Sequence, residues 1–298
     1  MKVSVIVPYC EPDGYLVRMR AQLAAQTHPD CETLFVQDAE RRGAAWARNR
    51  GLERATGEVV LFADVDDELS PDWVARMVAG LGAADLGWAA YTQVEGECRR
   101  LLPDGAPTAE LQGPAVEDYL AKRVFGYRLR DLPKAMLPGG LWKRCGREMA
   151  GVWRLAARRG VLDGLRFDES LRLYEDAMFI TAVSRRAKTL RVFGDAGYVW
   201  TVRSEGTMST EFAVRRLANK FAVRDARKAL DPGLRRWRGT FVLSILECLR
   251  YGGLKSAVRY ATGRPYSGYS DPKCDQDGQI GGFSDDAENT PLHTVRSF

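Results

Sequence analysis

The strongest constraint in this sequence is a regular alternation, across residues 1–96, between β-rich apolar runs and segments of helical spacing. Four runs predict strands, at residues 3–7, 32–38, 58–64 and 85–96. Three segments between them predict helices, at residues 15–26, 43–57 and 71–81. Strands and helices that alternate in this way predict an α/β fold with a mostly parallel sheet flanked by helices.

An acidic cluster follows the third predicted strand, where "ADVDDELS" contains Asp64, Asp66, Asp67 and Glu68. Carboxylates packed beside a core repel one another and lose hydration, so a partner normally compensates them. Asp38 ends the second predicted strand, and ligands of parallel α/β sheets bind beyond these carboxyl ends. Both places are therefore candidate parts of one site.

The acidic cluster allows several interpretations. One is a solvated loop before a helix capped by Ser70. An EF-hand is excluded, because Leu69 and Ala75 occupy the sixth and twelfth positions, where Gly and Glu are required. A phosphoryl-transfer hydrolase with Asp64 as nucleophile remains open, although Asp67 is an unusual next residue and the strand is not the first. The last is a D-x-D motif that holds a divalent cation against a nucleotide diphosphate.

The amino-acid composition limits which catalytic groups and metal sites are plausible. The chain has two histidines, His28 and His293, which removes most histidine-based mechanisms and leaves carboxylates as the plausible catalytic groups. The same scarcity favours cations that prefer oxygen ligands. The six cysteines are scattered without a C-x-x-C pair, so we expect reduced thiols rather than a disulfide framework or a zinc site.

Charge and hydropathy bear on location. No run approaches the roughly 20 apolar residues that span a bilayer, and the first residues predict a strand rather than a signal peptide. We therefore expect a cytoplasmic protein without a nucleic-acid partner. The net charge is +5, and basic residues crowd 215–239, where nucleic acid, acidic lipid or solvent are the alternatives and solvent is favoured. Residues 241–260 predict a packed helix, with a membrane-surface helix as the alternative.

Four segments resemble, in order, those of the family 2 inverting glycosyltransferases: "VSVIVPYCEPDGYL", "QTHPDCETLFVQD", "AAWARNRGLERATGEVVLFADVDDELSPDW" and "FDESLRLYEDAMF". The resemblance covers residues 2–92 and, more loosely, 135–210. It implies a GT-A type, Rossmann-like fold, a nucleotide-sugar donor (commonly a UDP-sugar) and a Mn²⁺ or Mg²⁺ ion. It also implies a glycan or lipid-linked acceptor in cell-surface polysaccharide synthesis, with peripheral association at the inner face of the plasma membrane as a hypothesis.

The resemblance assigns donor-side roles by position. Asp38 would hydrogen-bond the nucleobase, Arg48 would face the nucleotide, Asp64 would contact ribose or sugar, and Asp66 would bind the metal. The full set implied for nucleotide-sugar binding is Pro8, Tyr9, Glu11, Asp38, Arg48, Asp64, Val65 and Asp66.

The resemblance also assigns acceptor-side roles. Asp176, with Glu175 beside it in "LYEDAMF", would be the base that takes the proton of the acceptor hydroxyl. From the residues alone, the helix dipole is the favoured explanation for acids at the start of a helix. Trp142 would lie near the acceptor, where an aromatic face stacks on a sugar, or in the core. Arg203 and Ser204 would approach the diphosphate.

One departure from the family concerns the donor side. Between Asp38 and Arg48 the family usually has a helix and a strand, but "AERRGAAWA" is too short for both. Either the sheet lacks one strand or the donor pocket is built differently. A non-catalytic relative that no longer binds nucleotide is therefore a further alternative.

We expect four regions along the chain. Residues 1–100 would form the nucleotide-sugar-binding half of a GT-A domain, and 101–210 its acceptor-binding and catalytic half, with a loop or seam at the Pro/Gly-rich stretch 101–115. Residues 211–263 would form a basic helical extension, and 264–298 a disordered tail.

Overall fold

The computed structural model describes residues 1–103, 108–124, 151–171, 174–202, 221, 224–225 and 238–264. Four predictions lie outside these ranges. They concern Trp142, the pair Arg203 and Ser204, nearly all of the basic stretch 215–239, and the tail after residue 264.

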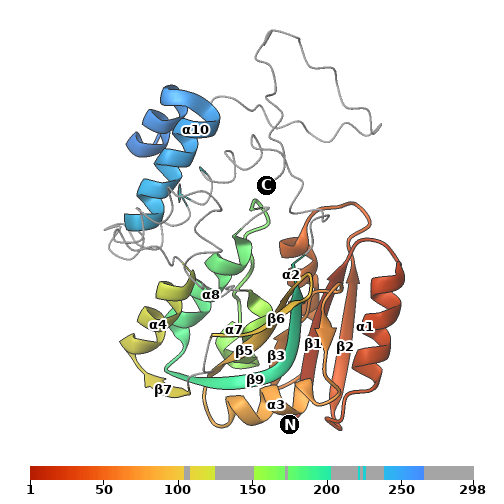
Figure 1. The fold of residues 1–298 in the computed structure, drawn as a ribbon. Coiled ribbons are helices and arrows are strands. Elements are labelled where there is room, and N and C mark those ends of the chain that lie inside the picture. The colour runs from red at the N-terminus through yellow and green to blue at the C-terminus, as the bar shows by residue number, and fades with distance from the viewer. Residues whose placement is uncertain are drawn as a thin grey trace. The chain divides into compact units, whose positions relative to one another are not determined.

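The chain begins with alternating strands and helices (Figure 1). They are β1 (Val3–Tyr9), α1 (Gly14–Ala24), β2 (Cys31–Gln37), α2 (Ala44–Arg54), β3 (Val59–Phe62), β4 (Glu68–Leu69), α3 (Trp73–Leu81) and β5 (Leu86–Glu95). The elements that follow are β6 (Cys98–Leu102), β7 (Ala109–Gln112), α4 (Pro114–Val124), the 3-10 helix η2 (Val152–Arg154), β8 (Leu155–Arg158), α7 (Arg159–Leu162), α8 (Glu175–Arg186), β9 (Thr189–Thr201) and α10 (Arg238–Thr262).

These strands form one sheet in the order β2-β1-β3-β8-β5-β9-β4, with β6 beside β5 and β7 beside β9. Strand β1 is parallel to β2 and β3, and β5 is parallel to β9. Strand β8 lies between β3 and β5 and is antiparallel to both. The strands that run in one direction are therefore β1, β2, β3, β5 and β9. The prediction of a mostly parallel α/β sheet flanked by helices is confirmed.

Helices cover both faces of this sheet (Figure 1). On β1 the side chains alternate: Val5 and Val7 pack with residues of α1 and α3, whereas Ile6 packs with residues of α2, α4 and α8. The resulting three layers bury β3 on both faces, since all four of its residues are buried. The carboxyl ends of β1, β2 and β3 are thereby held at one edge of a rigid core.

Helix α2 follows β2 after a short connection and packs closely on β1. Its small-residue face allows this approach, because a Cβ on Gly51 would lie 2.3 Å from Cγ2 of Ile6. Within the described ranges no strand lies beyond β2 in the sheet order. The shortened segment between Asp38 and Arg48 therefore corresponds to a sheet that lacks one strand.

Two local predictions were wrong. Helix α3 begins at Trp73 with Asp72 in the capping position, and Ser70 donates its hydroxyl hydrogen bond to Asp72. The start is later because Glu68 and Leu69 pair with β9, which keeps the chain extended. The described part of the stretch 101–115 is also not a simple loop, since it includes the end of β6, all of β7 and the start of α4. Strand β6 forms through a hairpin with β5, and β7 forms through long-range pairing with β9.

Within the described ranges, no helix combines the length and the apolar composition needed to cross a bilayer. Helix α10 is the expected C-terminal helix.

Candidate active site

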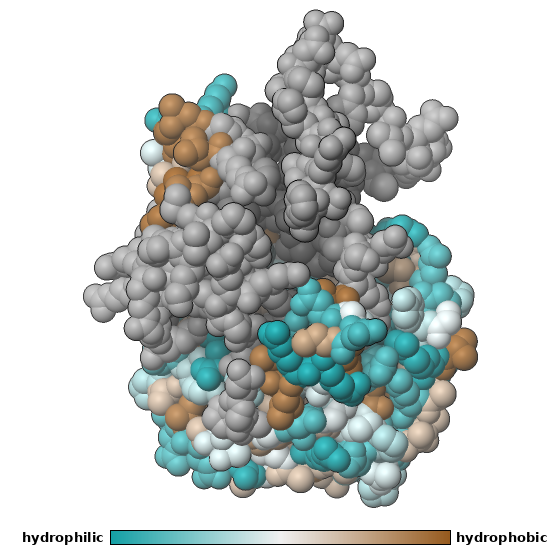
Figure 2. Space-filling view, in the orientation of Figure 1, coloured by the Kyte–Doolittle hydropathy of each residue, from teal (hydrophilic) through white to brown (hydrophobic). Residues whose placement is uncertain are grey.

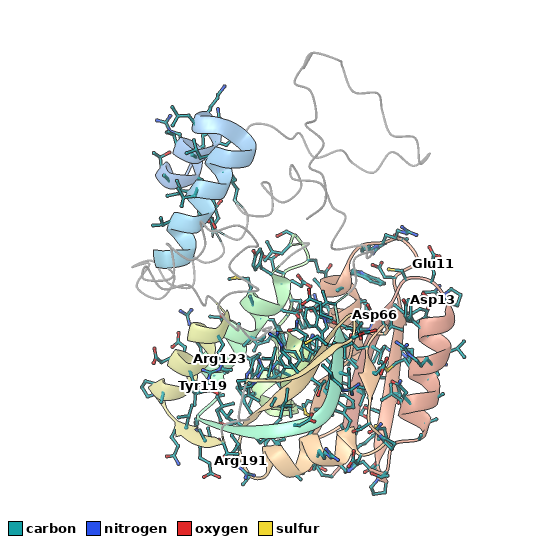
Figure 3. All side chains as sticks on the ribbon, viewed as in Figure 1. Glu11, Asp13, Asp66, Tyr119, Arg123 and Arg191 are labelled. Atoms are coloured by element: carbon teal, nitrogen blue, oxygen red, sulfur yellow. The ribbon has the colours of Figure 1, made fainter. Side chains whose placement is uncertain are left out.

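The acidic cluster forms a tight turn between β3 and β4. The backbone N–H of Asp67 donates to the carbonyl of Asp64 at 3.1 Å, and Arg18 of α1 donates to the carbonyl of Asp66 at 2.7 Å. Asp66 lies on the side of the sheet where Glu11 follows β1 (Figure 3). The turn therefore lies where the carboxyl ends of the parallel strands predict a ligand site.

Arg48 is the centre of the site. Its guanidinium donates to Asp64 Oδ1 at 2.8 Å, to Asp176 Oδ1 at 2.7 Å and to Glu175 Oε1 at 3.2 Å. Its side chain is only 4% exposed, whereas those of Asp64 and Asp176 are 31% and 20% exposed. One buried cation thus joins the acidic turn to the acids of α8, with Asp64 and Asp176 on the more open side.

The acids around Arg48 exceed its charge, because one guanidinium faces three carboxylates. Burial raises the pKa of Glu175 to about 7, with Asp176 adding to the rise and Arg48 opposing it. Burial also raises the pKa of Asp176, again opposed by Arg48, while Asp64 adds to the rise. The cluster therefore favours either a bound proton or a further cation.

Glu175 should make the stability of the fold depend on pH. Because its folded-state pKa is raised from an ordinary value of 4.5, the folded protein holds a proton that the unfolded chain releases. Stability should then fall as pH rises from about 4.5 to about 7. The free energy of unfolding of Glu175→Gln minus that of the parent should increase by on the order of 1–3 kcal/mol from pH 5.5 to pH 8. Urea unfolding at the two pH values measures this change.

Glu53→Gln is the control for this experiment. A hydrogen bond from Arg166 lowers the pKa of exposed Glu53, so its carboxylate stays ionised in the folded state across that range. The difference in free energy of unfolding between Glu53→Gln and the parent should be the same at both pH values. If the difference for Glu175→Gln were also the same at both pH values, Glu175 would not titrate in this range.

The two acids of α8 are held at its N-terminus. Tyr174 precedes them in the left-handed conformation (φ 68°), which is strained for a residue other than glycine. The second oxygen of Asp176 accepts the backbone N–H of Val152 in η2 at 3.1 Å. Each oxygen of the predicted base therefore has one donor, and both donors favour the ionised form.

Asn49, which was not singled out from the sequence, links helix α2 to the segment that precedes α8. Its amide donates to the carbonyl of Phe167 at 3.0 Å and accepts the N–H of Phe167 at 2.8 Å. It also donates to Glu169 at 2.7 Å. The sequence did contain a sign of this role. Arg48 and Asn49 are polar residues on a helix whose face toward the sheet otherwise consists of small residues. Both residues reach across to the segment around α8.

Asp38 organises the connection between β2 and α2. It is buried, and its two carboxylate oxygens accept the backbone N–H groups of Arg42 at 2.8 Å and Gly43 at 2.6 Å. Asp38 thus stabilises the turn that follows β2. Its hydrogen bond to a nucleobase stays a prediction.

The other residues that the resemblance implies for nucleotide-sugar binding lie at the same edge of the sheet. Pro8 and Tyr9 end β1 and pair with Val36 and Gln37 of β2. Glu11 lies on the surface and forms an ion pair with Arg41. Val65 packs at the edge of the core. These residues share one edge of the sheet with Asp64 and Asp66, which is the arrangement their predicted roles require.

The donor set of the turn fits a hard cation. Within the described ranges, no three His, Cys, Asp or Glu side chains converge as a ready-made metal site. The D-x-D motif nevertheless offers carboxylate oxygens, and Mg²⁺ is usually bound by one or two carboxylates, waters and substrate phosphates. Asp66 is the ligand that the family resemblance implies, and the neighbouring Asp64 is paired with Arg48.

Known proteins of one family resemble this chain. The model of glycosyl transferase family 2 matches residues 37–102. The succinoglycan biosynthesis protein ExoO of Rhizobium meliloti strain 1021 is 26% identical over 258 residues, which cover 80% of this chain and 68% of that protein. These matches support a family 2 glycosyltransferase. An uncharacterized glycosyltransferase of Nostoc sp. is 31% identical to this chain over 111 residues, 29% of this chain and 34% of the Nostoc protein.

Solved structures confirm the fold. TarS of S. aureus (residues 1–349) in complex with UDP has a TM-score of 0.54 and 19% identity, covering 88% of this chain and 75% of that one. The TarS complex with UDP-GlcNAc has a TM-score of 0.56 and 20% identity, covering 84% and 73%. The GT-A fold predicted from the sequence is therefore confirmed.

Proposed function

We propose that this family 2 glycosyltransferase is an inverting, divalent-cation-dependent enzyme that uses a nucleotide-sugar, with a UDP-sugar as the expected donor. The observation that carries the proposal is the Arg48 cluster, which brings the D-x-D turn and the acids of α8 to one place. A transferase needs this juxtaposition, because the donor and the attacking hydroxyl must meet. Residues 1–100 would supply the donor half of the domain, and residues 101–210 the acceptor half.

Asp176 is the proposed base. It is more exposed than Glu175, so an acceptor hydroxyl has better access to its carboxylate. The hydroxyl oxygen would form a bond to the anomeric carbon as its proton passes to Asp176, while the bond from that carbon to the diphosphate oxygen breaks. Attack opposite the leaving group inverts the anomeric configuration. Glu175 and Arg48 would hold Asp176 in position.

Asp66 would hold a Mn²⁺ or Mg²⁺ ion at the turn, with substrate phosphates as further ligands. When bound, such an ion neutralises charge that develops on a departing diphosphate. Asp64, which Arg48 orients, would contact the ribose or sugar of the donor.

The names of related proteins support the substrate classes. ExoO is a succinoglycan biosynthesis protein, and the TarS structures contain UDP and UDP-GlcNAc. We therefore propose a hydroxyl of a glycan or lipid-linked glycan as the acceptor, in synthesis of a cell-surface polysaccharide.

A screen of nucleotide-sugars for Mn²⁺-dependent hydrolysis tests the function. The parent should release the nucleoside diphosphate from one donor, and both Asp66→Ala and Asp176→Ala should lose this turnover. Equal turnover in all three proteins would contradict the assigned site. Metal-dependent phosphate release without a sugar donor would instead favour the phosphoryl-transfer alternative, and absence of heat on titrating UDP with Mn²⁺ would favour a non-catalytic relative.

We also propose peripheral contact with an anionic membrane surface through α10. Hydrophobic residues gather over this helix (Figure 2), and Leu249, Leu254 and Val258 are exposed. The segment 238–264 contains five Lys or Arg residues and one acid, which complements anionic lipid.

Flotation with phosphatidylglycerol vesicles at low salt tests this contact. The parent should co-float, and Leu254→Ser should reduce the bound fraction. Val17→Ser, which removes an exposed apolar side chain from α1, is the matched control and should bind as the parent does. Failure of the parent to co-float would contradict the proposal.

A further inference from the structure

Tyr198 connects strand β9 to the acidic turn. Its hydroxyl donates to Asp67 Oδ2 at 2.6 Å and accepts the backbone N–H of Asp64 at 3.1 Å. Tyr198 and Asp67 are both almost completely buried. One hydroxyl therefore holds the turn at Asp64 and at Asp67, on either side of Asp66.

The core fixes the position of this hydroxyl. The ring of Tyr198 stacks on Trp153, with centroids 4.6 Å apart and planes inclined by 6°. Trp73 packs against the same ring at 5.9 Å. Backbone pairing of Leu69 with Tyr198 also ties β4, which leads out of the turn, to β9. Tyr198 is thus a rigid support that belongs to the sheet and not to the turn.

The turn needs such a support. Asp64, Asp66 and Asp67 lie within four positions, and their mutual repulsion favours opening into water. A ligand site gains affinity when its donor atoms are already held in the bound arrangement. The hydroxyl of Tyr198 opposes opening through two bonds, one to the backbone and one to a side chain.

We propose that Tyr198 is a positioning residue for the D-x-D turn, acting through Asp67 and the amide of Asp64 to set the arrangement in which Asp64 and Asp66 meet the nucleotide-sugar and its cation. Its effect on ligand affinity rests on the proposed function of that turn. Asp67, in this account, is an anchor for Tyr198 and not a metal ligand. Neither residue was assigned a ligand-binding role from the sequence.

Tyr198→Phe tests the proposal, because phenylalanine keeps the aromatic stacking and removes only the hydroxyl. In the ligand-free protein, the Asp64 amide should exchange with solvent at least about tenfold faster by NMR. Affinity for UDP with Mn²⁺ should fall by about 10- to 100-fold, the range for outer-shell partners of metal sites. Unchanged exchange at Asp64 would overturn the proposal.

Tyr91→Phe is the matched control, since Tyr91 is a buried tyrosine whose ring packs against the same Trp153. It should leave both the Asp64 exchange rate and the UDP affinity near those of the parent. A loss of the same size in the control would assign the effect to general loosening of the core and overturn the proposal.

Variants of Asp67 separate anchoring from metal ligation. Asp67→Asn keeps an oxygen acceptor for Tyr198 and should retain most of the affinity, whereas Asp67→Ala should match Tyr198→Phe. The double variant Tyr198→Phe with Asp67→Ala should lose no more than either single one. Equal losses in the Asn and Ala variants, or additive losses in the double variant, would overturn the anchoring role. A parent that binds no UDP would refute the proposed function, while the ligand-free exchange result would still decide the role of Tyr198.

Discussion

Asp176→Asn should lower kcat by about 10²- to 10⁴-fold, the usual contribution of a positioned general base. Asparagine keeps the shape, and its single carbonyl oxygen can still accept from Arg48, but the side chain cannot take the proton of the acceptor hydroxyl. The loss should therefore appear in kcat, with little change in the affinity for UDP and Mn²⁺. Steady-state kinetics and calorimetric titration of the same preparation measure the two quantities.

The pH dependence of the parent gives a second readout of this base. Because burial raises the pKa of Asp176, kcat should rise with pH as its carboxyl loses a proton. Asp195→Asn, a change of an exposed carboxylate on β9, should have no effect on kcat. If Asp176→Asn retained the activity of the parent, Asp176 would not be the base.

Arg48→Met should be strongly destabilising, by about 3–5 kcal/mol, the usual result of removing one partner from a buried ion pair. Methionine occupies much of the same space, but it leaves Asp64, Glu175 and Asp176 without their shared cation. The free energy of unfolding, measured in urea, should therefore fall most at high pH. It should recover in part at low pH, as the carboxylates take up protons.

Arg50→Met is the matched control for this change. Arg50 lies on the same helix, but its side chain is 43% exposed and pairs with Glu53 at the surface. Its removal should cost less than about 1 kcal/mol. Equal losses for the two arginines would show that Arg48 contributes no more than a surface charge. Arg48→Lys should fall between the parent and Arg48→Met, since one ammonium cannot serve three carboxylates in the fork geometry of a guanidinium.

The strands and helices up to residue 96 are predictable because each carries its own periodicity. On β1, Val5 and Ile6 face opposite layers, and on α3 the buried residues recur at helical spacing up to the terminating Gly82. Such patterns act locally, so they can be read without a partner. Strands β4, β7 and β8 were missed because their partners are distant in sequence. In β8, for example, Ala156 pairs with both Leu61 and Gly87.

The main strands and helices up to residue 96, the acidic motif at a strand end and the family motifs with Arg48, Asp64 and Asp176 could all be predicted from the sequence. The packed fold was needed to show that one guanidinium joins those carboxylates and that Tyr198 of β9 holds the turn. Arg48 and Asp176 are 128 positions apart, and Tyr198 and Asp67 are 131 apart. Hydrogen bonds and ion pairs act over a few ångströms, so their partners are set by the packing of layers and not by spacing along the chain.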